Sequence, residues 1–362
     1  MNVCHVVNVA QDTTMACDLA TTQCKQKEID DVGILAWNEI TSFRGEDIVD
    51  VHCLEIPEDR LRITREEYHQ LKKILSTYDV VHVHHHLSGF YAKVVARRLK
   101  KTIISTDHNN HQGYTMMGRL MEAISNVFVD DVVCVSESVR DSYSWWERAL
   151  LWRTNVSTIT NGVDIDRIET AKSVDWSIYD VANIDEGSIV VGSAGMLIEQ
   201  KAHDVLLEAI EIANRDSDIP IEVVISGDGE LRSELEAQIT NAEYGSRMHL
   251  LGFLEKREQV YKMMHEVDVC AMPSRWEGFC VAALEGLATE NAAVFSDIPE
   301  FRRPFGSIAA FHEPDNHKQL AEKIVQLTAD KSTLDEIAKE SSMLVVREHS
   351  LDSVADRYLS TY

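Results

Sequence analysis

Two glutamates in the stretch PSRWEGFCVAALEG, Glu277 and Glu285, stand eight positions apart, and a glycine follows the first directly. A strand pattern ends at Pro273 and an apolar helical pattern begins near Phe279, which predicts one carboxylate in a loop and the other about two turns into a helix. The amides of Gly278, Phe279 and Cys280 would then lie at a helix N-terminus, where free N–H groups and the helix dipole favour a phosphate. The spacing indicates a phosphate held between two carboxylates that bind hydroxyls of a sugar and a ribose. An ordinary acidic first turn of a helix is the alternative.

A second candidate phosphate loop is GSAGMLIEQKAHD, residues 192–204. Gly192 and Gly195 end a strand pattern and leave the backbone open to close approach by a ligand, and Lys201 follows at the start of the next helix. A tight turn followed by a surface lysine would explain the same residues. Together with the first loop, however, this stretch predicts the two sides of one diphosphate pocket.

Histidines gather in DVVHVHHHLSG, where His82 and His84 face the same way on a strand and the run continues to His86 in the loop. A metal site needs three or four converging ligands, and other candidates for it are Asp79, His108 and His111. A metal-dependent hydrolase that uses the cluster His82–His86 is therefore an alternative. We favour one histidine lining a cleft, because the two phosphate loops would have no role in such a hydrolase.

The elements that must position these residues alternate between strand and helix. We expect strands at residues 5–9, 80–85, 102–106, 131–136 and 156–160 and, after a polar stretch at 165–187, at 188–195, 221–229, 248–253 and 268–274. Helices are expected at 89–101, 137–143, 202–215, 231–240 and 257–267. Apolar strands that alternate with helices form parallel sheets covered on both faces. The sequence thus predicts an α/β protein with two Rossmann-like doubly wound domains, 1–170 and 180–345, and ligands bound in the cleft between them at the carboxyl ends of the strands.

Composition limits the classes of function. The 362 residues suffice for two domains, 44% of them are hydrophobic, and the net charge is −25, most of it after residue 170. An acidic surface repels phosphate backbones, so we expect no nucleic-acid partner. The seven cysteines form no CxxC pair, and neither a basic leader nor a long apolar run is present. These features predict a cytoplasmic protein with reduced thiols.

A further stretch, YSWWERALLWR, mixes aromatic and basic residues at helical spacing: Trp145, Trp146, Trp152, Arg148 and Arg153. Such a helix can lie on a membrane surface, although an aromatic stripe of this kind also occurs in cores. We therefore keep open a peripheral contact with the inner face of a membrane through the N-terminal domain.

Several motifs together carry a resemblance to a known family. NGVD (161–164), KAHDVLLEA (201–209), GDGELRSELE (227–236), LLGF (250–253) and the E-x7-E pair follow one another in an order similar to that of GT-B glycosyltransferases of the large retaining E-x7-E family, the group 1 or family 4-like enzymes. DVVHVHHHLSG followed by TIISTDHNN resembles the histidine-bearing N-terminal loops of that family. The resemblance covers nearly the whole chain.

The resemblance implies a transfer of sugar from a nucleotide-sugar to an acceptor hydroxyl, with retention at the anomeric carbon. Lys201, with Gly195 beside it, would neutralise the donor diphosphate; Glu277 would hold sugar hydroxyls, and the amides of residues 278–280 would touch the distal phosphate. Glu285 would bind the ribose, and His108 would approach the transferred sugar from the other domain. No metal or other cofactor is implied, since the nucleotide-sugar is a substrate.

The resemblance also implies glycan or lipid-linked acceptors, a role in the biosynthesis of cell-surface polysaccharide, glycolipid or glycoprotein glycans, and a C-terminal helix, residues 346–362, that packs back on the first domain. Two departures from the family pattern stand out. Met196 occupies the position of an arginine that usually pairs with the lysine, and NVAQDTTMACD lacks the usual adjacent glycines. A non-catalytic GT-B partner subunit that binds nucleotide-sugar is therefore the second functional hypothesis. The sequence leaves the base, the sugar and the acceptor open.

Overall fold

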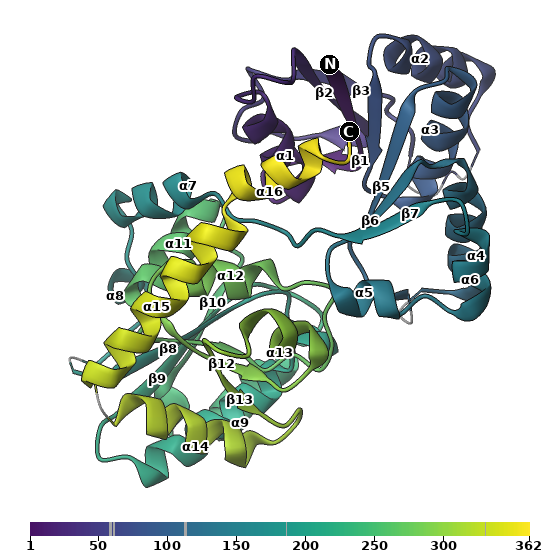
Figure 1. The fold of residues 1–362 in the computed structure, drawn as a ribbon. Helices are drawn as coiled ribbons and strands as arrows, with labels where there is room; N and C mark the ends of the chain where they lie inside the picture. Colours follow the sequence, from purple (N-terminus) through teal and green to yellow (C-terminus); the bar gives the residue numbers. More distant parts are fainter. Residues whose placement is uncertain (58–59, 61, 112–113, 186, 330) are drawn as a thin grey trace. The chain divides into compact units, whose positions relative to one another are not determined.

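The structure is a computed structural model that describes residues 1–362 except 58–59, 61, 112–113, 186 and 330. The chain forms two compact units, Met1–Gly162 together with Leu351–Tyr362, and Val163–Ser350 (Figure 1). Each unit has its own parallel sheet with helices on both faces, so the predicted doubly wound α/β class is confirmed. The chain passes between units after Gly162 and after Ser350, whereas the sequence suggested boundaries at 170–180 and 345.

The sheet of the first unit has the strand order β3-β2-β1-β4-β5-β6-β7. Its strands are β1 (Asn2–Ala10), β2 (Asp31–Ile40), β3 (Asp50–Cys53), β4 (Val80–Val83), β5 (Thr102–Asp107), β6 (Asp131–Cys134) and β7 (Asn155–Thr158). Runs such as VVHV in β4 are buried along their whole length, as expected for a strand covered on both faces. The register places His5 of β1 opposite His82 of β4.

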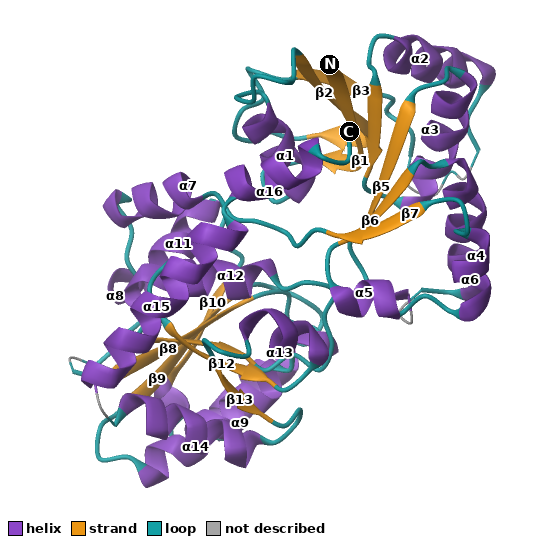
Figure 2. Cartoon of the chain, in the orientation of Figure 1, coloured by secondary structure: helices purple, strands orange, loops and turns teal. Residues whose placement is uncertain are grey.

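The helices of the first unit are α1 (Met15–Gln23), α2 (Arg65–Ser76), α3 (His86–Arg98), α4 (Met116–Ser125), α5 (Glu137–Asp141), α6 (Trp145–Leu150) and α16 (Leu351–Leu359), with a 3-10 turn, η2 (Asn126–Phe128). Figure 2 shows α2 and α3 on one side of the sheet and α1 and α16 on the other. Helix α16 places Val354, Ala355 and Tyr358 in the same apolar cluster as Leu19 of α1 and Val7 of β1. The end of the chain is thus part of the core of this unit.

The sheet of the second unit has the order β10-β9-β8-β11-β12-β13. Its strands are β8 (Ile189–Ala194), β9 (Ile221–Ser226), β10 (Met248–Gly252), β11 (Val269–Met272), β12 (Ala292–Ser296) and β13 (Ala310–His312). The helices are α7 (Ile165–Thr170), α8 (Ile178–Val181), α9 (His203–Asp216), α10 (Arg232–Asn241), α11 (Arg257–Glu266), α12 (Val281–Ala288), α13 (Pro299–Phe305), α14 (His317–Thr328) and α15 (Lys331–His349), with 3-10 turns η3 (Ala171–Ser173), η4 (Glu199–Lys201) and η5 (Gly245–Arg247).

Each sheet reverses its strand order once, between β1 and β4 in the first unit and between β8 and β11 in the second. At such a point the loops that leave neighbouring strands run to opposite faces, and ligands of doubly wound folds bind in the opening between them. The loops after β8 and β11 carry Lys201 and Glu277, and the loop after β4 carries His84 and His85. Most predicted site residues therefore lie at the reversal point of their own sheet.

Two sequence-based expectations concern the whole chain. All 7 cysteines are free of disulfide bonds in the described structure. Among the described helices, none combines the length and the apolar character that crossing a membrane requires.

Candidate functional site

Lys201 and Glu277 meet at the carboxyl end of the second sheet. The ammonium nitrogen of Lys201 lies 2.6 Å from Oε1 of Glu277, and the hydroxyl of Ser274 donates to the same oxygen at 2.7 Å. The side-chain amide of Gln200 donates to Oε2 at 3.2 Å. Glu277 is only 4% exposed, so three donors orient a buried carboxylate. A charge-assisted contact of this kind is short and directional, and it fixes the lysine at the strand end.

The lysine of this pair is charged. Burial opposes its charge, but the charge of Glu277 and its hydrogen bond to the ammonium raise the pKa of Lys201 above its ordinary value. Burial in turn raises the pKa of the Cys280 thiol to about 12, so that thiol is neutral at neutral pH. Glu277 is therefore the counter-ion that keeps Lys201 protonated.

Arg275 joins the two candidate phosphate loops. Its backbone amide donates to the carbonyl of Gln200 at 2.8 Å, and its guanidinium donates to the carbonyl of Glu199 at 2.6 Å. The guanidinium also pairs with Asp204 at 2.8 Å, at the start of α9. The two loops thus form one structure, as the sequence suggested, but the residue that ties them was missed. The only feature of the sequence that could have indicated Arg275 was its position between Ser274 and Glu277.

A third loop, GDG at residues 227–229, packs against the first. Gly227 has a φ of +140°, and a Cβ there would lie 1.9 Å from the carbonyl oxygen of Gly195. A Cβ on Gly195 itself would contact the aliphatic part of Lys201 at 3.3 Å. Glycines are thus needed here for close packing of the loops around the lysine stem. Met196, the next residue, is 61% exposed.

Glu285 lies in the second turn of α12 and is held by a residue that sequence reasoning missed. Arg257, the first residue of α11, donates to Oε1 of Glu285 at 2.8 Å from Nη2 and at 3.3 Å from Nε. The carboxylate is buried. No local pattern marks this pair, because its partners are 28 positions apart and belong to different helices.

Helix α12 begins at Val281, with Cys280 as its N-cap, two residues later than the sequence suggested. Gly278 and Phe279 therefore precede the helix. The ring of Phe279 is 8% exposed and packs near Phe305 and His349, with ring centroids 6.3 Å and 6.1 Å away. This packing explains the later start, since it anchors the loop before the helix, and it leaves Phe279 only its backbone to offer to a ligand.

His108 belongs to the first unit, and it lines a pocket at the carboxyl ends of β1 and β4. The pocket has a volume of about 410 Å³, and other residues around it are His84, His85, Asn8 and Thr14. Burial lowers the pKa of His108 to about 4, although Asp107 opposes this effect, so its imidazole is neutral at neutral pH. The side-chain oxygen of Asn8 is buried without a hydrogen-bond partner in the described chain. A neutral imidazole can donate a hydrogen bond to a ligand hydroxyl or accept one from it.

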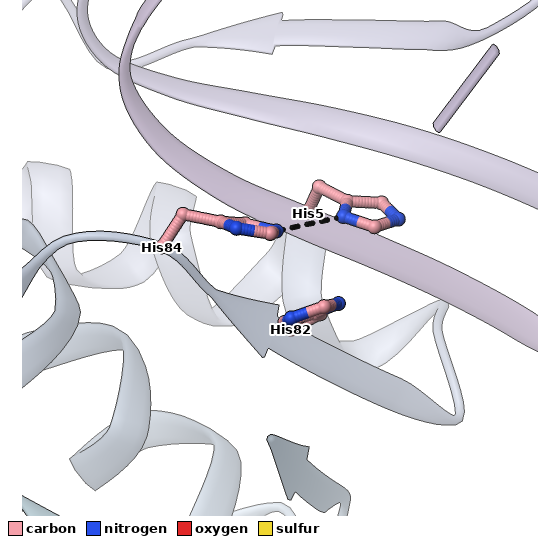
Figure 3. Close-up of side chains that lie close together, drawn as sticks. All are labelled: His5, His82 and His84. Atoms are coloured by element: carbon pink, nitrogen blue, oxygen red, sulfur yellow. Dashed lines mark hydrogen bonds between the residues drawn. The ribbon is translucent and has the colours of Figure 1, made fainter. Parts of the chain in front are cut away.

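Several of the predicted metal ligands contact other residues and do not converge on one point. His85 contacts the side-chain amide of Asn8 at 3.0 Å, and the side chain of His86 lies outside the described part of the chain. Asp79 accepts from the backbone amide of Asn2 at 2.9 Å. His111 lies between Asp107, at 3.1 Å, and Glu147, at 3.0 Å. The ring nitrogens that do converge are those of His5, His82 and His84, within 4.8 Å of one another (Figure 3).

Comparisons with known proteins place both units in one class. A solved structure of Anabaena HepE in complex with UDP and glucose matches the whole chain with a TM-score of 0.79 at 14% sequence identity, covering 100% of this chain and 99% of that one. The fold is therefore GT-B, the two-domain class of glycosyltransferases.

The family follows from the sequence of each unit. Residues 26–167 match the family model described as Glycosyltransferase Family 4, and residues 175–342 match the one described as Glycosyl transferases group 1. The two matches succeed one another along the chain, which belongs to the glycosyltransferases of this group 1 and family 4 type, as the resemblance suggested.

Two relatives from Escherichia coli illustrate the match. The O-antigen biosynthesis glycosyltransferase WclY is 25% identical over 266 residues, which are 70% of this chain and 71% of the relative. The UDP-Gal:alpha-D-GlcNAc-diphosphoundecaprenol alpha-1,3-galactosyltransferase is 26% identical over 240 residues, which are 64% of this chain and 60% of the relative. The chain is thus similar to transferases that are named for glycan assembly.

Proposed function

We propose that this transferase moves a glycosyl group, with retention at the anomeric carbon, from a nucleoside diphosphate sugar to an acceptor hydroxyl in glycan or glycolipid biosynthesis. The observation that carries the proposal is the buried pair of Lys201 and Glu277 at the reversal point of the second sheet. A fixed cation and a fixed acceptor beside glycine-rich loops match the diphosphate and the hydroxyls of such a donor.

Lys201 supplies the positive charge that stabilises the departing diphosphate, and Glu277 accepts hydrogen bonds from the donor sugar. The backbone of residues 278–280 lies before the N-terminus of α12, where a distal phosphate is favoured. Glu285, held by Arg257, accepts hydrogen bonds from the ribose. His108 receives a hydroxyl of the transferred sugar. Most of the rate enhancement then comes from orientation and from charges fixed before the reaction.

In the reaction itself the bond between the anomeric carbon and the diphosphate oxygen breaks as a bond to the acceptor oxygen forms on the same face. The acceptor proton passes to the departing diphosphate, which serves as the base. No metal bound by the protein takes part, so we expect turnover to survive a chelator.

A donor hydrolysis assay without acceptor tests this function. We expect Glu277→Gln and Lys201→Ala each to lower the rate about 100-fold or more, the loss typical when one fixed charge-stabilising group is removed. Lys318→Ala, an exposed lysine of the same unit, is the matched control and should leave the rate unchanged. A protein that binds nucleotide-sugars without turnover would instead be the non-catalytic partner subunit.

Thermal unfolding against a panel of nucleotides and nucleotide-sugars identifies the donor. A ligand present at 100 times its dissociation constant adds about 2.7 kcal/mol to the stability of the folded state. If no nucleotide or nucleotide-sugar shifts the melting temperature, the donor site assigned to Lys201 and Glu277 is wrong. NMR of the anomeric proton in the product then tests retention.

We also propose that the first unit contacts a cytoplasmic membrane surface through α4 and α6, and that its acceptor is lipid-linked. Trp145 is 82% exposed and Trp152 is 74% exposed, with the guanidinium of Arg153 over the Trp152 ring at 4.4 Å. The neighbouring α4 and the turn after it expose further large apolar side chains: Met116, Met117, Leu120, Ile124 and Val127. Exposed aromatic, apolar and basic groups on adjoining helices suit an anionic interface. One relative carries diphosphoundecaprenol in its name.

Co-sedimentation with anionic liposomes tests the membrane contact. We expect binding at low salt that weakens as salt rises, and loss of binding in the double variant Trp145→Ser and Trp152→Ser. Trp276→Ser serves as the control, because Trp276 is also exposed, at 47%, but belongs to the second unit. Equal binding by both variants would disprove a contact through α6 and the turn after it.

A further inference from the structure

Four side chains in the first unit form a continuous chain of hydrogen bonds that ends at His108. Gln23 Oε1 lies 2.8 Å from Nε2 of His5, and Nδ1 of His5 lies 2.9 Å from Nε2 of His84 (Figure 3). Nδ1 of His84 lies 3.2 Å from Nε2 of His108. Each ring uses one nitrogen toward each neighbour, so the rings are linked in series from α1 to the loop after β5.

A second branch leaves Gln23 through its amide nitrogen. That nitrogen donates to the hydroxyl of Tyr362 at 2.9 Å, and the same hydroxyl lies 2.8 Å from Nδ1 of His82. Nε2 of His82 lies 2.7 Å from the hydroxyl of Thr106. Gln23 is fully buried, and its amide therefore joins the residues after α16 to the histidines of β1 and β4.

All of these rings are neutral at neutral pH. Burial lowers the pKa of His5 to about 4, and burial together with the neighbouring histidines holds the pKa values of His82 and His84 well below the ordinary range. Burial raises the pKa of Tyr362, so its phenol keeps its proton. A neutral imidazole has one N–H donor and one bare nitrogen acceptor. The nitrogen that carries the proton in one ring therefore determines which nitrogen carries it in the next.

Gln23 determines the tautomer of His5, because its side-chain oxygen faces His5 and its nitrogen faces Tyr362. An amide oxygen only accepts, so Nε2 of His5 carries the proton and Nδ1 of His5 is bare. Nε2 of His84 must then donate to His5, which leaves Nδ1 of His84 to accept from Nε2 of His108. We propose that Gln23, oriented by Tyr362, fixes the tautomer of His108 through His5 and His84 and leaves its Nδ1 without a proton.

In this structure Oε1 of Gln23 faces His5 and Nε2 faces Tyr362, and this orientation sets the direction of the series, because an imidazole and a hydroxyl can each donate or accept. The opposite orientation would reverse every bond in the chain, and His108 would then carry its proton on Nδ1. Two arrangements of one network thus give opposite hydrogen-bonding character to a side chain that lines the pocket. Gln23 and Tyr362 are positioning residues in this scheme, since they act on His108 only through other side chains.

The role of the His108 tautomer in sugar binding rests on the proposed function. With Nδ1 bare, His108 can accept a hydrogen bond from a hydroxyl of the transferred sugar but cannot donate one from that nitrogen. The tautomer itself is a property of the first unit without any substrate. A failure of glycosyl transfer and a failure of this inference are therefore measured separately.

A metal ion bound by the same histidines is the competing hypothesis. His5, His82 and His84 could each offer one nitrogen within 4.8 Å of the others. A metal between His5 and His84 would, however, replace their 2.9 Å hydrogen bond, and the nitrogens of His82 already face Tyr362 and Thr106. The hydrogen-bonded arrangement keeps all of these contacts of His5, His82 and His84, so we favour it.

Nitrogen-15 NMR of histidine-labelled full-length protein, without substrates, tests the tautomer directly. Loss of one signal set in His108→Asn assigns His108. We expect a bare Nδ1 and a protonated Nε2 in the unaltered protein. A protonated Nδ1 there overturns the proposal without any further variant. A change in the pattern on adding zinc, or on removing metal with EDTA, overturns it in favour of a metal site.

Two substitutions test the role of Gln23 and Tyr362. In Tyr362→Phe the amide of Gln23 loses its partner, and in Gln23→Leu His5 loses its fixed acceptor, so each variant should convert the single His108 tautomer into a mixture. Tyr358→Phe is the matched control, because Tyr358 contacts Thr106 at 3.2 Å on the branch that does not lead to His108. An unchanged tautomer in a folded Tyr362→Phe protein, or an equal change in Tyr358→Phe, contradicts the proposal.

Discussion

Lys201 is balanced by a single buried carboxylate, and the position where related enzymes usually carry an arginine holds Met196 instead. A diphosphate that leaves with two or more negative charges would therefore meet Lys201 but no arginine at position 196. A thioether contributes no charge and only a weak acceptor. The residue at 196 is also exposed, so a longer polar side chain there would not disturb the core.

Met196→Arg should strengthen the binding of nucleoside diphosphates. A hydrogen bond to a charged group is worth about 1.5–3 kcal/mol, which corresponds to an affinity gain of about 10- to 100-fold. Titration calorimetry with the nucleotide selected by thermal screening measures the gain, with Met196→Leu as the uncharged control. Equal affinities in the two variants would mean that position 196 does not face the diphosphate.

Ala202, directly after Lys201, adopts a left-handed conformation with φ 51° and ψ 39° at the N-cap of α9. An alanine in this region costs roughly 1–2 kcal/mol, while a glycine there costs more entropy on folding, by about 0.4–1 kcal/mol. We expect Ala202→Gly to stabilise the protein by up to about 1 kcal/mol, seen as a higher melting temperature. Ala237→Gly, in the exposed interior of α10, should instead lose about 1 kcal/mol. Ala202 is fully buried, so the loss of its methyl contacts offsets part of this gain. A loss of stability larger than that in Ala237→Gly would refute backbone strain at this cap.

At the scale of elements, β1, β4 and the segment from α16 to Tyr362 enclose neutral histidines in a polar cluster inside the first unit. His5 has a folded-state pKa of about 4, below the ordinary value of 6.5, and His82 and His84 are shifted in the same direction. His108, Tyr358 and Tyr362 face the same cluster. The unfolded chain therefore binds protons that the folded chain excludes.

The folded state should therefore lose stability as the pH decreases. The stability associated with these histidines is complete above pH 6.5 and falls as the pH decreases toward 4, by up to about 1.4 kcal/mol per pH unit for each ring. Urea unfolding at several pH values between 6.5 and 4.5 measures the slope. His5→Gln should reduce the slope relative to the unaltered protein. A slope near zero in this window would contradict burial of neutral rings.

The strands and loops that carry the site were predictable because apolar runs and glycines mark them locally. The sequence predicted that the loops of Lys201 and Glu277 form two sides of one pocket, but it did not predict the ion pair between the two side chains. Arg257, Gln23 and Tyr362 were not, because each acts through a contact between side chains distant in sequence, which leaves no local pattern. Gln23 and Tyr362, for example, are 339 positions apart. The start of α12 was misplaced for a related reason, since the burial of Phe279 depends on α13 and α15.

At the scale of the molecule, each unit has its own apolar core, and Lys201 and Glu277 of the second unit lie in the segments that follow β8 and β11. A nucleotide bound there should slow hydrogen exchange in residues 195–202 and 273–283, because binding raises the free energy of local opening. Exchange measured by mass spectrometry with and without nucleotide tests this. The effect should vanish in Lys201→Ala. Slower exchange confined to the first unit would locate the nucleotide elsewhere.

The division of the first unit between Met1–Gly162 and Leu351–Tyr362 affects how it is made on the ribosome. All residues of the second unit are synthesised before α16 exists, so His82 of β4 and Thr106 of β5 lack their contacts with the hydroxyls of Tyr362 and Tyr358 until then. The second unit is a continuous segment and can complete its core first. During this interval the nascent first unit holds an unfinished polar cluster, and the segment Leu351–Tyr362, synthesised after the second unit, completes it.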